Sequence, residues 1–241
     1  MIGAMVAIAA WQLLATSKSA LYLPTLRATL SAAQATLVEP QYWRDLLATC
    51  RRSALGFLLA AITGVPLGLL LGVWDAGYRF VSLPVDFVRS IPTAALLPVF
   101  LVVFGLGDLS KIAVVYFGCV FVFFIGSLYG ARGGPDTLAR KQAIRVMGGG
   151  RVDQFVYVVI PEAVLSVATS LRLAASLALV LAVFTEMFLG SDDGVGRRLI
   201  DAYLSFRIPL MYVYIATLGL VGVTVNGLLE SVERRYVASR M

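Results

Sequence analysis

Five segments of the sequence are apolar over roughly 20 consecutive residues, the length that a helix needs to cross the hydrocarbon core of a bilayer. Each segment is continuously apolar, which favours helices over a membrane barrel, and a helix in lipid satisfies its own backbone hydrogen bonds. Since 59% of the residues are hydrophobic and only 14% are charged, the surface of an ordinary globular domain cannot be built from this chain. The segments are residues 53–74, 84–104, 111–130, 164–189 and 209–229.

A shorter apolar stretch, residues 2–16, lacks the basic start of a cleaved signal peptide and is expected to form a first helix. This helix either extends to Leu23, with Lys18 reaching toward the lipid head groups, or is clipped at its start. Residues 24–50 show a mixed helical pattern that is typical of a segment at the membrane surface. The most economical architecture is all-α: a polytopic bundle of about six transmembrane helices, forming one domain over residues 1–241.

The composition excludes several classes of chemistry. The chain has no histidine and only two cysteines, so it offers neither a Ser-His-Asp triad nor a histidine or paired-cysteine metal site. A phosphate-binding G-x-x-x-x-G-K-[ST] sequence is also absent, so any nucleotide hydrolysis must come from a partner. We therefore expect no catalytic residue and no metal. The cationic residues behind the net charge of +6 lie in loops between apolar segments. Contact with lipid head groups or with a partner protein explains their position better than binding of nucleic acid does.

Small residues recur at every fourth position of the apolar segment 53–74, so another helix can approach this stripe closely. Packing within the chain is the simpler interpretation, and self-association is the alternative. Pro66 interrupts the stripe and would bend the helix. The stripe consists of Gly56, Ala60, Gly64, Gly68 and Gly72.

The apolar segment 84–104 carries a charged pair near its start and is interrupted by prolines. Asp86 and Arg89 are three residues apart, so they share a helix face and can form an ion pair. Pro92 and Pro98 then break the apolar run.

A charged loop covers about residues 131–161. Its middle, residues 142–147, is amphipathic at helical spacing, and three glycines follow at 148–150. This pattern predicts a short docking helix ended by a flexible turn, with a positive φ angle at Gly148. The loop's cationic residues are Arg132, Arg140, Lys141, Arg145 and Arg151.

The spacing of this loop resembles the Glu-Ala-Ala…Gly…Ile/Val-x-Leu-Pro signature of ABC importer permeases. The matching residues are Gln142, Ala143, Ile144, Gly148 and Pro161. Two further stretches, from Arg89-Ser90-Ile91-Pro92 to Ile112 and LRLAASLALVLAVFTEMFLGSDDGVG at 171–196, resemble the nitrate, sulfonate and taurine branch of that family. The resemblance runs over about residues 45–235. Gln142 departs from the family pattern, which has a glutamate there.

The resemblance implies a type I ABC importer permease fold in a bacterial inner membrane. It implies that the loop docks on a cytoplasmic ATPase through Gln142, Ala143, Ile144, Met147, Gly148 and Pro161. The expected partners are two ATP-binding cassette subunits, a periplasmic or lipid-anchored substrate-binding protein, a second copy of the permease or a homologous one, and membrane lipid. ATP and Mg would be bound by the ATPase and not by this chain. The implied cargo is a small polar solute, most often an anion such as nitrate, a sulfonate or taurine, bicarbonate or a carboxylate.

Two ionisable residues, Arg172 and Glu186, lie inside the apolar segment 164–189, where an unpaired charge is costly. They are separated by about 40° around a helix axis and by roughly 21 Å along it, so they cannot contact each other. Each either holds a neighbouring helix or lines the transport path; with Arg89 and Pro92 they form our candidate path or gate. Asp192 and Asp193 follow in a glycine-rich turn, which is better explained as solvated than as a calcium site.

Two other classes of protein remain open from the residues alone. A secondary transporter driven by an ion gradient would show internal repeats and coupling-ion residues near the midplane, and the sequence shows no repeat and few buried carboxylates. A membrane enzyme is disfavoured because no pair of catalytic groups is present.

Overall fold

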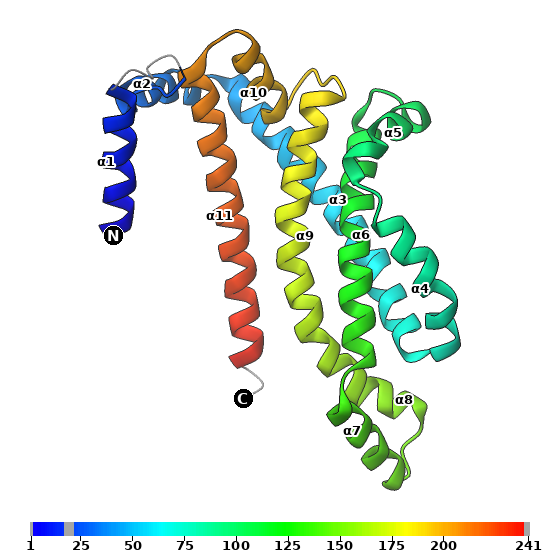
Figure 1. Cartoon of the computed structure of the whole chain (residues 1–241). Helices are drawn as coiled ribbons and strands as arrows, with labels where there is room; N and C mark the ends of the chain where they lie inside the picture. The colour runs from blue at the N-terminus through cyan, green and yellow to red at the C-terminus, as the bar shows by residue number, and fades with distance from the viewer. Residues whose placement is uncertain (1, 17–21, 239–241) are drawn as a thin grey trace. The chain divides into compact units, whose positions relative to one another are not determined.

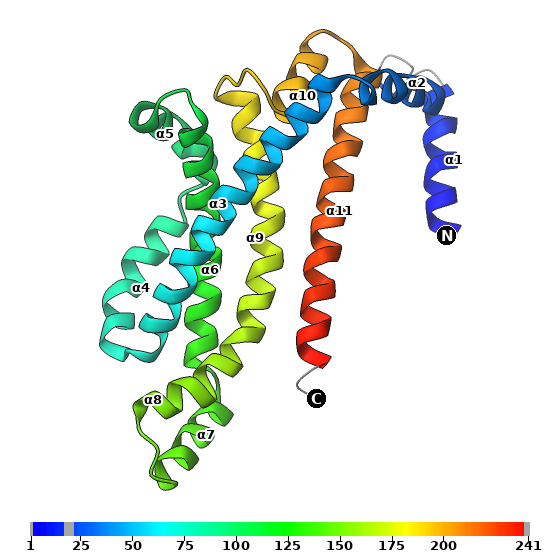
Figure 2. The same cartoon turned by 180° about the vertical axis from the view of Figure 1, so that it is seen from behind.

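The computed structural model describes residues 2–16 and 22–238, and every regular element within those ranges is a helix. Lys18 lies outside the described residues. Figures 1 and 2 show the elements from opposite sides. They are α1 (Ile2–Thr16), α2 (Leu26–Leu37), α3 (Pro40–Val73), α4 (Asp75–Arg89), the 3-10 helix η1 (Thr93–Leu96), α5 (Leu97–Phe104), α6 (Asp108–Arg132), α7 (Pro135–Val146), α8 (Arg151–Gln154), the π-helix η2 (Phe155–Val159), α9 (Ile160–Phe188), α10 (Val195–Leu204) and α11 (Ile208–Ala238).

The all-α prediction is confirmed, whereas the count of six spans is not. Among the described residues, four helices are long and apolar enough to cross a membrane: α3, α6, the continuous run Arg151–Phe188, and Ile208–Ser231 of α11. A fifth crossing is available if α4 and the η1–α5 segment act as one broken span. Helix α1 has 15 residues, fewer than the roughly 20 that a crossing requires.

The apolar segment 84–104 is not one continuous helix: the break predicted at Pro92 is present, and α4 and the η1–α5 segment meet at an angle of 80°. Pro92 disfavours helical geometry at the residue before it, and its own backbone is extended, with φ −58° and ψ 120°. Pro98 lies in the first turn of α5, where its missing N–H breaks no intrahelical bond. Helix α3 begins earlier than the sequence predicted. Residues 40–50, which were assigned to the surface segment, are continuous with its membrane span.

The chain forms two compact units. One consists of the chain up to Arg51 together with Val183–Thr224, and the other of Arg52–Ala182 with the chain from Val225 onward. Helices α3, α9 and α11 each contribute residues to both units.

The small-residue stripe of α3 packs against α6 inside the second unit, which confirms packing within the chain. A Cβ atom added to Gly64 would lie 2.8 Å from the backbone oxygen of Val120, so the two helices touch through their backbones. Gly56 faces Val115, and Gly72 faces Leu128 sixteen residues further along α3, so the helices run in the same direction. The broken pair α4 and α5 must therefore return the chain from the end of α3 to the start of α6 (Figure 1).

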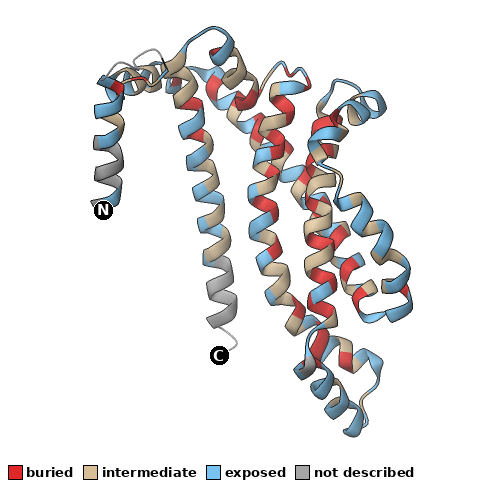
Figure 3. Ribbon diagram, in the orientation of Figure 1, coloured by how far each residue is buried: buried red, intermediate tan, exposed pale blue. Residues whose placement is uncertain are grey.

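Helix α6 also packs against α9, and 11 of its 25 residues are buried, spread along its length (Figure 3). The Sγ–H group of Cys119 donates to the backbone oxygen of Ala174 over 3.4 Å. A Cβ atom added to Gly130 would lie 2.9 Å from the Cβ atom of Ser166, so these helices also approach closely. The loop that carries α7 and α8 joins α6 to α9 at the end where α3 also finishes.

Candidate sites for transport and coupling

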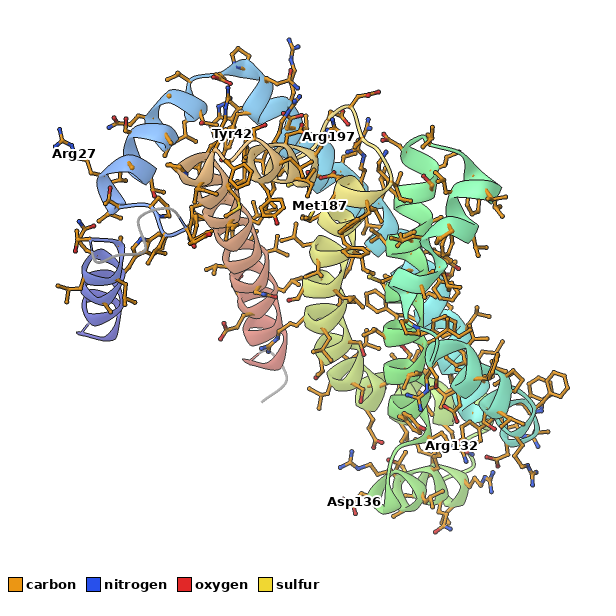
Figure 4. All side chains as sticks on the ribbon, turned by 45° about the horizontal axis from the view of Figure 1, so that its top comes forward. Arg27, Tyr42, Arg132, Asp136, Met187 and Arg197 are labelled. Carbon is orange, nitrogen blue, oxygen red and sulfur yellow. The ribbon has the colours of Figure 1, made fainter. Side chains whose placement is uncertain are left out.

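The loop between α6 and α9 contains the predicted docking helix, α7, followed by a glycine turn and α8. Helix α7 is held to the first turn of α9 by Glu162. Its carboxylate accepts a hydrogen bond from the Thr137 hydroxyl, and Arg140 forms an ion pair with it at 2.9 Å. The same Thr137 oxygen accepts the backbone N–H of Gly134 at 3.0 Å, which caps the helix. Figure 4 labels Arg132, at the end of α6, and Asp136, in the first turn of α7.

The outer surface of α7 carries apolar side chains that contact water in the isolated chain. Val146 is 88% exposed and Met147 is 85% exposed, and Leu138 is also exposed. Gln142 and Ala143 are exposed, whereas Ile144 is half-buried. A helix with this much exposed apolar surface at its end is typical of a protein docking site.

The turn after α7 has the predicted geometry. Gly148 has φ +84°, a conformation that L side chains rarely adopt. Its N–H donates to the backbone oxygen of Arg145 at 3.0 Å, and the N–H of Gly149 donates to that of Ile144 at 2.9 Å, which satisfies carbonyls at the helix end. Pro161, the last residue of the coupling set, is the second residue of α9 and directly precedes Glu162.

A cavity of about 640 Å³ lies among the end of α4, η1, α6 and α9, within the second compact unit. Most of its wall is apolar or aromatic. Arg89 is the one cationic side chain among the described residues that line it. Pro92 is not part of the wall, although its neighbours Ile91 and Thr93 are. The lining is completed by Phe117, Gly118, Phe121, Val122, Ile125, Gly126, Tyr129, Ser166, Thr169, Ser170, Leu173 and Leu177.

Hydroxyl groups of α9 form the polar wall of this cavity. Ser166, Thr169 and Ser170 share one helix face because they are three and four residues apart. Thr169 and Ser170 donate to backbone oxygens four residues earlier, at 3.1 and 3.0 Å, and each oxygen can still accept. Arg89 forms the predicted pair with Asp86 at 2.8 Å, and both side chains are about half exposed, so the pair adds little stability.

Arg172 and Glu186 have different environments. Arg172 is exposed on α9 and is not among the residues that line the Arg89 cavity. Glu186 is fully buried in the first compact unit. One of its oxygens, Oε2, accepts hydrogen bonds from the Thr49 hydroxyl at 2.8 Å and from the Gly196 N–H at 2.9 Å. These contacts fix the start of α10.

A second buried carboxylate, that of Asp45 in α3, also contacts the start of α10, and it was not predicted from the sequence. It accepts the N–H of Gly194 at 2.9 Å and pairs with Arg198 at 2.7 Å. The hydrogen bond to Asp45 raises the pKa of the Arg198 guanidinium above its ordinary value. Within the described residues, no group of three or more His, Cys, Asp or Glu could hold a metal ion, and that includes the turn at Asp192 and Asp193.

Comparison with known proteins agrees with this architecture. The model of the family described as binding-protein-dependent transport system inner membrane component matches residues 64–238, more than two thirds of the chain. A nitrate import permease protein of Leptolyngbya laminosa is 28% identical over 237 residues, which cover 94% of this chain and 83% of that protein. A permease protein of Bacillus subtilis named for aliphatic sulfonates transport is 27% identical over 237 residues, covering 98% of this chain and 85% of that protein.

A solved structure of the MetNI methionine ABC transporter, described as inward facing, has the same fold. It superposes with a TM-score of 0.70 at 21% identity, and the match covers 82% of this chain and 98% of that one. The apolar helices, the docking helix with its glycine turn and the family match lead to one conclusion. The chain belongs to the inner-membrane permease components of binding-protein-dependent ABC transport systems.

Proposed function

We propose that this permease carries a small organic anion, a sulfonate or a carboxylate, through the cavity beside Arg89. The observation that carries the proposal is the composition of that wall, which combines one guanidinium and several hydroxyls with a mostly apolar and aromatic surface. The volume of about 640 Å³ lies within the range of roughly 300–1,000 Å³ that is typical of small-molecule sites. Relatives named for nitrate import and for aliphatic sulfonates transport support an anionic cargo.

Electrostatics favours an anion over a cation in this cavity, because Arg89 lines it whereas its partner Asp86 does not. The aromatic and aliphatic wall favours an organic anion over bare nitrate, because it can bury the apolar body of a sulfonate or carboxylate. Thr169 and Ser170 have hydroxyls that can turn from their backbone acceptors to the anionic head group, and Ser166 supplies a third hydroxyl to the same wall.

Transport on this proposal is driven by two separate cytoplasmic ATPase subunits that bind ATP and Mg, and a soluble binding protein delivers the solute. A second permease copy or a homologous permease completes the transporter. Closure of the ATPase pair on ATP moves the docking helix α7. Glu162 links that motion to α9, because it contacts both Thr137 and Arg140. Since α9 carries the hydroxyl wall of the cavity, the motion can change the exposure of the cavity from one side of the membrane to the other.

The test is uptake into proteoliposomes that contain the permease, its ATPase and its binding protein. We expect saturable uptake of an alkanesulfonate or carboxylate, and a large loss of uptake in Arg89→Gln. Arg79→Gln is the matched control, because Arg79 is exposed on the same helix and does not line the cavity. Equal uptake by both variants would contradict the role of Arg89. Transport of a cationic solute alone would contradict the proposed cargo.

A further inference from the structure

A second cavity, of about 560 Å³, lies where α3 ends and the docking loop begins. It brings together the turn between α3 and α4, one face of α7, and the α8–η2 segment. Its lining residues are Val73, Trp74, Asp75, Lys141, Arg145, Arg151, Gln154, Phe155 and Val159.

The wall of this cavity is strongly cationic. Lys141, Arg145 and Arg151 line it, and Asp75 is the one carboxylate among its described lining residues. Asp75 is already paired with the Nη2 atom of Arg132 at 3.2 Å, so it leaves the other three charges without compensation from the wall. Three cations from two helices around one cavity form a site for an anion with several oxygens, such as a phosphate.

Arg132 lies beside the cavity, since it pairs with the lining residue Asp75. Its guanidinium lies 4.1 Å from the centre of the Tyr78 ring and contacts Asp75, yet its Nη1 atom is buried without a hydrogen-bond partner.

Trp74 points to a membrane–water interface beside this cavity. Trp74 directly follows the α3 span and is 58% exposed, and tryptophan is enriched where a membrane meets water. Val73, Phe155 and Val159 give the wall an apolar part beside the cations. A soluble phosphate would use only the cations, whereas a phospholipid would use both surfaces.

We propose that this cavity binds the phosphate head group of an anionic phospholipid, with its acyl region against the apolar residues beside Trp74. Arg145 and Arg151 would form paired hydrogen bonds to the phosphate oxygens, and Lys141 would add a third charge. The lipid would hold α7 against the end of α3. Its assignment to the cytoplasmic leaflet rests on the proposed function, because the docking loop then faces the ATPase.

The experiment is tryptophan quenching in the full-length chain in nanodiscs, without ATPase or substrate. Replacing Trp11 and Trp43 by phenylalanine leaves Trp74 as the one tryptophan of the three in the sequence. Brominated phosphatidylglycerol should quench Trp74 more strongly than brominated phosphatidylcholine does at the same mole fraction. Inorganic phosphate and glycerol phosphate should leave this difference unchanged.

The variant Arg145→Gln/Arg151→Gln should weaken the preference for phosphatidylglycerol by on the order of 10-fold to 30-fold. The matched control is Arg27→Gln/Arg44→Gln, which removes the same charge from exposed arginines that do not line the cavity and should keep the preference. If the double variant does not fold, Lys141→Gln tests the same site with a smaller expected loss.

Three results would overturn the proposal: equal quenching by the two lipids, a preference that survives in the double variant, or displacement by soluble phosphate. Because the assay contains neither ATP nor solute, a failure of uptake would contradict the proposed function and leave lipid binding standing.

Discussion

The apolar end of the docking helix provides a sharp test of coupling. Replacing both Val146 and Met147 by serine removes two side chains that are 88% and 85% exposed in the isolated chain, so the fold should lose little stability. If docking on the ATPase buries both, each loses at least about 1.5 kcal/mol of burial free energy, or ~3 kcal/mol together. That loss corresponds to a rise of roughly 100-fold in the Kd for the ATPase.

The assay is titration of a labelled ATPase subunit onto the permease in nanodiscs. Val102→Ser/Leu106→Ser is the matched control, because these residues are 87% and 67% exposed and lie near the start of α6, away from the docking loop. Its Kd should match that of the unmodified chain. An unchanged Kd for the Val146 and Met147 variant, or an equal loss in the control, would refute docking through this surface.

Three further predictions concern the folded chain and the path. Asp45→Ala should destabilise the protein by about 2–4 kcal/mol, because it leaves the buried N–H of Gly194 and the partly exposed Arg198 without their acceptor. Thermal unfolding in detergent measures this loss, and an unchanged Tm would contradict it. Gly148→Ala should cost about 1 kcal/mol of loop stability and reduce uptake, because φ at this residue is +84°. Gly150→Ala, where φ is −84°, should transport normally. Equal uptake by the two variants would contradict the claim that backbone strain at Gly148 impairs transport. Arg172→Leu should lower substrate-stimulated ATP hydrolysis more than the yield of folded protein, and a parallel loss of both would favour a structural role.

Hydropathy was enough to locate the membrane helices because their signal is local. The predicted span 111–130 lies within α6, and 209–229 lies within α11. Helix α4 was missed over residues 75–83 because it is amphipathic, so no 20-residue apolar window contains it. The 80° bend after α4 depends on Pro92, which the sequence shows, and on packing, which it does not.

The docking loop could be predicted for the same reason, since helical spacing and the glycine at 148 are features of consecutive residues. The cavity beside Arg89 could not be predicted, because it forms only where α4, α6 and α9 come together. Arg89 and Ser170 are far apart in the sequence, and nothing local indicates that both line one space. Asp45 was missed for a related reason: its partner Arg198 is 153 residues away.

The most direct test of the central claim is solute accumulation in proteoliposomes that hold the permease with its ATPase and binding protein. We predict accumulation that requires ATP and the binding protein, continues when ion gradients are collapsed, and is lost when the ATPase is omitted. Accumulation by the permease alone, driven by a proton or sodium gradient, would contradict the account.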